Sequence, residues 1–123
     1  MTISTETDQA DGSTKKNSFL ETKIFDGLEN LNTGFTDESI YFFSEKDFKT
    51  VLDRAEHFGL GIYTIEPWYN DKPYEVLNHK TYKKKATNPK WYKYAFIEFK
   101  KREKDLIYSA TYGVSKKLLA DKD

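Results

Sequence analysis

The feature that most constrains the fold is one amphipathic helix, predicted over residues 44–58. Ser44 is a suitable N-cap, and Asp47, three positions later, completes a capping box at the start of the helix. The apolar residues that follow recur at helical spacing and form one stripe: Phe48, Val51, Leu52, Ala55 and Phe58. Gly59 then stands where a helix end favours left-handed backbone. Because a single apolar stripe must be buried against another layer, the rest of the chain has to supply one sheet face.

Most of the remaining chain predicts β-strands. Strands are favoured where apolar and polar residues alternate and where Ile, Tyr, Thr and Val are frequent. Five segments have this character: 39–43, 60–65, 74–82, 92–101 and 106–114. Pro67 and the cluster Asn-Asp-Lys-Pro at 70–73 are expected to end the second segment and make a turn. Ser115 is expected to cap a short helical turn over 115–120. The prediction is therefore an α+β fold in which one amphipathic helix packs on a mostly antiparallel sheet of four or five strands.

Length and composition limit the domain organisation. Residues 1–18 contain almost nothing to bury and predict a disordered tail, which leaves 19–123 as a single α+β domain. The chain has no cysteine, which excludes disulfides, thiolate chemistry and Cys-based zinc sites. Neither a transmembrane-length apolar run nor a secretory signal pattern is present. We expect a cytoplasmic protein without membrane contact, cofactor or bound metal.

Charge is balanced overall but segregated along the chain. The sequence has 20 Lys and Arg and 20 Asp and Glu, which give a formal net charge of zero. Residues 71–123 carry fourteen basic and seven acidic side chains, whereas residues 1–70 carry six basic and thirteen acidic ones. The folded protein should therefore have an acidic side and a basic side, which can steer a charged partner.

The basic charge is concentrated between His79 and Arg102. This segment holds nine Lys or Arg and one acid, Glu98, with six aromatic residues set among them. Cations can neutralise phosphate or attract carboxylates, and aromatic rings can stack on bases or anchor a protein interface. The same pattern is also typical of an amphipathic strand with one face solvated by lysine. The segment therefore supports two binding hypotheses and one purely structural interpretation.

The first hypothesis is a small non-enzymatic module that binds a protein partner with an acidic surface, as inhibitors, adaptors and toxin-immunity proteins do. Trp and Tyr are frequent interface anchors, and lysines can guide an acidic surface towards them. We expect the anchors and the steering lysines near the predicted loops: Trp68, Tyr69, Trp91 and Tyr92 as anchors, with Lys83, Lys84, Lys85 and Lys90 for steering.

The alternative hypothesis is a single-stranded RNA-binding domain. The strand predicted at 94–99, Tyr-Ala-Phe-Ile-Glu-Phe, resembles the second part of the RNP1 signature of RNA-recognition motifs, whose sheet aromatics stack on bases. The resemblance implies that Tyr94 and Phe96 contact bases while nearby lysines hold phosphate. The chain departs from the signature at Tyr92, where Lys or Arg is expected, and at Lys93, where glycine is expected.

Recognisable catalytic signatures are absent from the sequence, including a P-loop, a dinucleotide-binding glycine motif, H-E-x-x-H and G-x-S-x-G. His57 and Glu66 are the candidates for acid–base chemistry, because each adjoins aromatic residues. Neither has a partner that the sequence places beside it. We therefore expect the protein not to be an enzyme.

Overall fold

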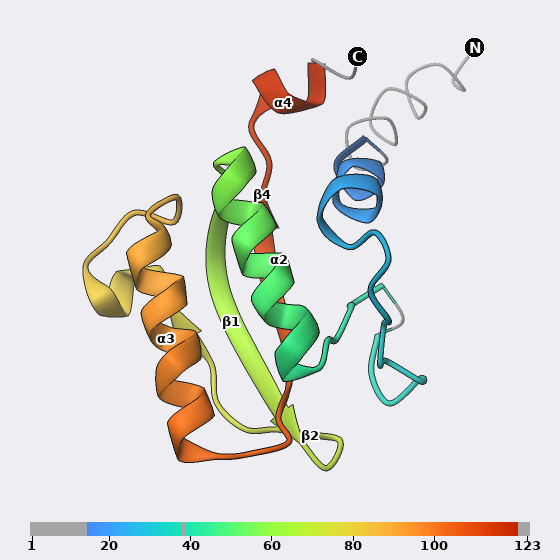
Figure 1. The fold of residues 1–123 in the computed structure, drawn as a ribbon, viewed down its shortest axis with the longest axis vertical. Helices are drawn as coiled ribbons and strands as arrows, with labels where there is room; N and C mark the ends of the chain where they lie inside the picture. The colour runs from blue at the N-terminus through green and yellow to red at the C-terminus, as the bar shows by residue number, and fades with distance from the viewer. Residues whose placement is uncertain (1–14, 38, 121–123) are drawn as a thin grey trace.

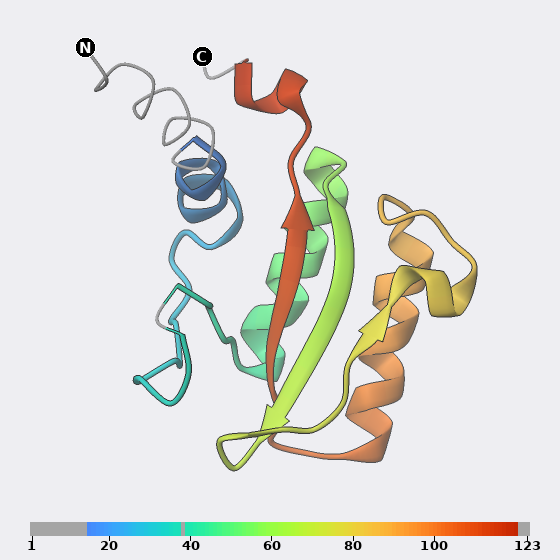
Figure 2. The same ribbon diagram turned by 180° about the vertical axis from the view of Figure 1, so that it is seen from behind.

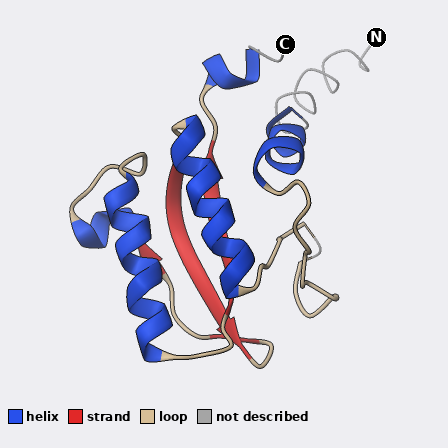
Figure 3. Ribbon diagram, viewed as in Figure 1, coloured by secondary structure: helices blue, strands red, loops and turns tan. Residues whose placement is uncertain are grey.

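Two helices, α2 (Glu45–Phe58) and α3 (Pro89–Arg102), lie on the same face of an antiparallel sheet (Figure 1). The computed structural model describes residues 15–37 and 39–120. The sheet contains four strands among these residues: β1 (Gly61–Tyr69), β2 (Lys72–Pro73), β3 (Leu77–Asn78) and β4 (Ile107–Gly113). The other helical elements are short: η1 (Leu20–Ile24), η2 (His79–Tyr82) and α4 (Lys116–Ala120) (Figure 3). The predicted α+β class and its antiparallel sheet are confirmed.

The long strand β1 is the centre of the sheet. It pairs with β4 along one edge, and with β2 and β3 along the other edge. The strand ends at Tyr69 before a turn at Asn70 and Asp71, as predicted, but the prediction that Pro67 contributes to its end is wrong. Pro67 lies between the residues that pair with β3 and those that pair with β2, where its carbonyl accepts a hydrogen bond from Tyr74 N at 2.9 Å. A strand edge tolerates proline at such a position because no N–H is needed there.

Helix α2 forms as the sequence predicts. Its N-cap Ser44 accepts a hydrogen bond from Asp47 N at 3.2 Å, and Gly59 ends the helix with a left-handed φ of 70°. The apolar stripe is buried against the sheet, including Phe48 and Val51, which have no exposed surface. Capping groups and apolar spacing agree at every position of this element, which is why the prediction succeeds.

The strand predicted over 92–101 is wrong, because residues 89–102 form helix α3. Asn88 is its N-cap and accepts a hydrogen bond from Lys90 N at 2.9 Å, while Pro89 occupies the first turn, where its missing N–H has no intrahelical partner to lose. The buried side chains recur at helical spacing: Trp91, Tyr92, Ala95, Phe96 and Phe99. Asn88-Pro89 is therefore the start of a helix.

Three further predictions need correction. In the predicted strand 74–82 only β3 is extended, and the residues after it form η2, capped by Asn78. Residues 39–43 contribute to the sheet only the bridge between Phe43 and Tyr108. Of the predicted disordered tail, residues 1–14 lie outside the described residues, and 15–18 are helical and lead into η1. The predictions of β4 and α4 are confirmed.

The core lies between the helices and the sheet and is mostly aromatic. The Tyr108 ring of β4 stacks on Phe48 of α2 at 5.0 Å and meets Phe96 of α3 edge-on at 5.1 Å. Trp91 Nε1 donates to Ile62 O at 3.1 Å and ties α3 to β1. In the described part of the chain no helix covers the opposite face of β1 and β4, which Figure 2 shows from behind.

Candidate functional site

Five lysines are carried by η2, by the loop that follows it and by the first turn of α3, and η2 lies beside α3 (Figure 1). All of them are exposed: Lys80, Lys83, Lys84, Lys85 and Lys90. Among the described residues, none of these ammonium groups has a carboxylate within 4.0 Å. The group is therefore a patch of uncompensated positive charge.

Hydrogen bonds hold the backbone that presents these lysines. His79 Nδ1 lies 2.7 Å from Lys84 O, and Asn88 N donates to Lys85 O at 3.0 Å. Ile62 N donates to Ala86 O at 2.9 Å, which fastens the loop to β1. The lysines thus project from a backbone that is tied to both β1 and α3.

Two tyrosines and one isoleucine lie on η2 and α3, the elements that carry most of these lysines. Tyr94 is 53% exposed, and its ring meets Tyr82 edge-on at 5.7 Å. Burial, and then the charge of Glu98, raise the pKa of Tyr82, so that its hydroxyl stays a neutral donor at physiological pH. Ile97 is 45% exposed and lies one turn after Tyr94 on the same side of α3. We call the five lysines with Tyr82, Tyr94 and Ile97 the lysine–tyrosine surface.

Two other basic residues of α3, Lys93 and Arg102, have acidic partners, whereas Lys100 and Lys101 have none among the described residues. Lys93 forms ion pairs with Glu56 and Asp53 of α2, and its hydrogen bond to Glu56 raises its pKa. Arg102 pairs with Glu75 at 2.6 Å. Part of the basic charge between 79 and 102 is therefore neutralised by contacts between elements, and only the remainder is free to attract a partner.

Of the binding residues predicted from the sequence, Lys83, Lys84, Lys85, Lys90 and Tyr94 are exposed and belong to this surface. The structure contradicts a contact role for three others, which are buried in the core: Trp91, Tyr92 and Phe96, with exposed fractions of 1%, 0% and 4%. The reason is the helical path of α3, which turns these rings towards the sheet. Their aromatic character contributes to packing and not to a surface.

Trp68 and Tyr69 lie at the opposite end of β1, next to β2 and far from the lysine patch (Figure 1). Trp68 is half-buried under Phe35 and Phe42, with ring centroids 5.3 and 5.2 Å away. Tyr69 is 39% exposed. The structure therefore does not bring these two predicted anchors together with the lysines.

The predicted RNP1-like strand at 94–99 is wrong because these residues belong to α3. On a helix, Tyr94 and Phe96 cannot share a face as they would on a strand. Tyr94 is exposed and Phe96 is buried against Phe48 and Tyr108. The pair cannot form the sheet platform on which RNA-recognition motifs stack bases.

The two acid–base candidates lie in different places. His57 is exposed at the end of α2 and its ring meets Phe58 edge-on at 4.9 Å. Glu66 lies on β1 and lines a groove beside β4. Within residues 15–37 and 39–120, no group of three or more His, Asp or Glu side chains is placed to bind a metal ion.

Sequence reasoning missed Lys80, Tyr82 and Ile97. The signal that finds Ile97 is the helix start at Asn88, because from there Lys90, Tyr94 and Ile97 fall on one side of a helix. The contact between Tyr82 and Tyr94 depends on how η2 packs on α3, which no local pattern encodes.

No family model matches the chain, and neither the curated proteins nor the solved structures yield a match. In the described part of the chain, no helix combines the length and apolar character needed to cross a bilayer.

Proposed function

We propose that this chain is a small non-enzymatic module that binds a partner protein, and that the lysine–tyrosine surface contacts an acidic region of that partner. The observation that carries the proposal is the patch of five exposed lysines, which lack carboxylate neighbours among the described residues. Clustered like charges repel one another, so an anionic partner would relieve this repulsion and would also be steered towards the surface.

The apolar part of the surface favours a protein over a nucleic acid. Ile97 and the exposed ring of Tyr94 lie side by side on α3, and an aliphatic side chain offers a base no flat stacking partner. Tyrosine is enriched at protein interfaces, where its ring packs and its hydroxyl donates. The surface therefore combines an exposed apolar side chain and an exposed ring on α3 with cations at the start of that helix, which suits an acidic protein surface with an apolar patch.

The direct test is affinity capture from a lysate of the source organism with immobilised full-length chain. The variant reverses three charges of the surface: Lys83→Glu, Lys84→Glu and Lys85→Glu. We expect it to lose a defined set of acidic proteins by about tenfold or more, since each exposed ionic contact contributes about 0.5 kcal/mol and reversal adds repulsion. Quantitative mass spectrometry measures the loss.

A matched control reverses three exposed lysines outside the surface: Lys46→Glu, Lys72→Glu and Lys104→Glu. This control changes net charge equally and should retain the captured proteins. Equal loss in both variants would show that only net charge matters. Capture that disappears after nuclease treatment would instead indicate nucleic acid as the ligand and contradict the proposal.

A further inference from the structure

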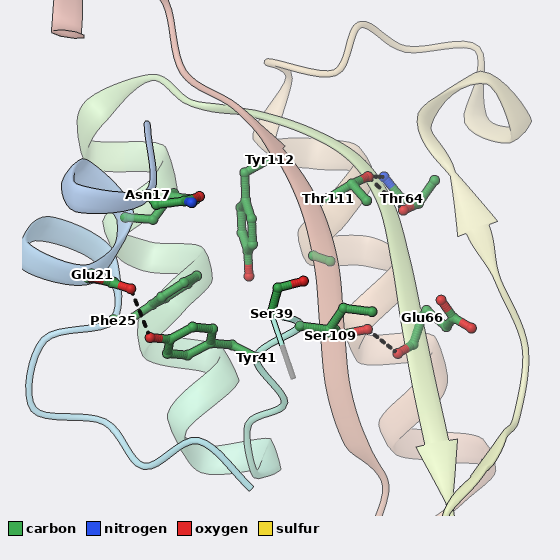
Figure 4. A pocket seen from close by; sticks show the side chains of 13 residues that line it. Asn17, Glu21, Phe25, Ser39, Tyr41, Thr64, Glu66, Ser109, Thr111 and Tyr112 are labelled. Atoms are coloured by element: carbon green, nitrogen blue, oxygen red, sulfur yellow. Dashed lines mark hydrogen bonds between the residues drawn. The ribbon is translucent and has the colours of Figure 1, made fainter. Parts of the chain in front are cut away.

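A groove of about 580 Å³ lies on the other side of the molecule from α3, along β4 (Figure 4). One wall is the helical segment that ends in η1, and this segment contributes Glu21. Residues 39–41 form the end of the groove. The other wall is the sheet face that no helix covers, including Ser109 and Thr111. Phe25 and Tyr112, whose rings are 5.5 Å apart, line it between these walls.

The groove runs beside an incompletely paired strand edge. Tyr108 exchanges two hydrogen bonds with Phe43, at 2.9 and 2.8 Å, on the edge of β4 that faces away from β1. Alternate residues of an antiparallel strand direct their backbone groups to the same edge, so Ala110 and Tyr112 also direct theirs outward. No backbone group within residues 15–37 and 39–120 bonds to them there. Such an edge can pair with one further strand.

The groove also contains a buried hydroxyl without a partner. Tyr112 is 7% exposed, and its hydroxyl has no hydrogen-bond partner in the described part of the chain. In Figure 4 the hydroxyl points into the space beside Ser39 and Tyr41. Burial raises the pKa of Tyr112, so the group stays protonated and can donate to a ligand carbonyl.

The charge of the groove is acidic. Among the described residues, the charged ones that line it are Glu21 and Glu66, and none is Lys, Arg or His. Glu21 accepts a hydrogen bond from the Tyr41 hydroxyl at 3.1 Å, which holds its carboxylate at the wall. A ligand with a cationic group therefore complements this groove.

From the free edge, the unpartnered hydroxyl and the acidic walls, we propose that the groove binds an extended peptide segment of a partner protein that carries Lys or Arg and adds as a strand to β4. The chain's own residues 1–14 match this charge poorly, because they contain three acids and no Lys or Arg. A second copy paired through β4 would meet the helical segment that lies beside this edge in both Figure 1 and Figure 2.

The test is a titration of isotope-labelled full-length chain with the capped peptide acetyl-Thr-Lys-Val-Lys-Thr-amide, followed by backbone amide NMR. We expect the largest shifts and slowed hydrogen exchange at Ala110 and Tyr112. The Glu21→Lys variant should bind at least fivefold more weakly. The control Glu29→Lys, an equal charge reversal at an exposed acid outside the groove, should bind as the unmodified chain does.

Two comparison peptides complete the experiment. The anionic analogue acetyl-Thr-Glu-Val-Glu-Thr-amide should not bind, and an N-methylated cationic analogue should lose binding because it cannot form strand hydrogen bonds. The proposal is overturned if N-methylation leaves affinity unchanged, if Glu21→Lys and Glu29→Lys weaken binding equally, or if the β4 amides do not shift. Concentration-dependent shifts of the β4 amides without peptide would assign the edge to a second copy instead.

Discussion

At the scale of single residues, three tyrosine hydroxyls are buried without a partner in the described part of the chain: Tyr92, Tyr108 and Tyr112. Burial raises the pKa of each, because a phenolate in the core would lose its hydration. An unfolded tyrosine ionises near pH 10. The unfolded chain therefore releases these protons at a lower pH than the folded chain does.

The sign of the resulting pH dependence follows from this difference. A folded-state pKa above the unfolded value leaves stability unchanged below about pH 10 and lowers it at higher pH, by up to about 1.4 kcal/mol per pH unit for each such tyrosine. We predict that the free energy of unfolding of Tyr112→Phe declines less steeply with pH above about pH 10, because one fewer buried tyrosine contributes to the decline. Urea unfolding between about pH 8 and 11.5 measures the free energy of unfolding of both proteins. An identical pH dependence for the unmodified chain and Tyr112→Phe would contradict the raised pKa of Tyr112.

At the scale of elements, the contrast between α2 and α3 shows what local sequence determines. In α2 the capping box, the apolar stripe and Gly59 all predict the same helix. In α3 the run from Tyr92 to Phe99 alternates and is rich in β-favouring rings, so its local pattern predicts a strand. Tertiary packing prevails, because a helix buries five of its side chains under α2 and the sheet.

The rest of the sheet shows the same distinction. Strand β4 was predictable because its alternation agrees with its burial, with Tyr108 and Tyr112 facing the core. The bounds of the short strands β2 and β3 could not be predicted, because each strand pairs over only two residues with β1. Their positions depend on contacts distant in sequence, which also decide that Tyr82 reaches Tyr94 to build the candidate surface.

The two sides of α3 should respond differently to truncation. Phe96→Ala removes a ring buried against Phe48 and Tyr108, and we expect a loss of about 3–5 kcal/mol in the free energy of unfolding. Tyr94→Ala, on the exposed side, should change it by less than about 1 kcal/mol. Chemical denaturation compares them, and equal losses would mean that both residues face the core, contrary to the helix.

At the scale of the whole molecule, α3 joins the core to the surface. Its buried rings close the core, Lys93 and Arg102 pair with acids of neighbouring elements, and its exposed side extends the lysine patch. The two proposed sites lie at opposite edges of the sheet, one beside α3 and one beside β4 (Figure 2). A single small domain could therefore contact an acidic surface and a basic peptide together, as an adaptor does.

The lysine–tyrosine surface depends on residues 89–102 forming a helix with one buried and one exposed side. The most direct test is NMR of the full-length chain in solution. We predict strong sequential amide–amide NOEs from Lys90 to Lys101, with carbon shifts typical of helix. A strand over 92–101 would instead give weak amide–amide contacts, strong sequential Hα–amide contacts and cross-strand Hα–Hα NOEs. That result would contradict the helix and the surface built on it.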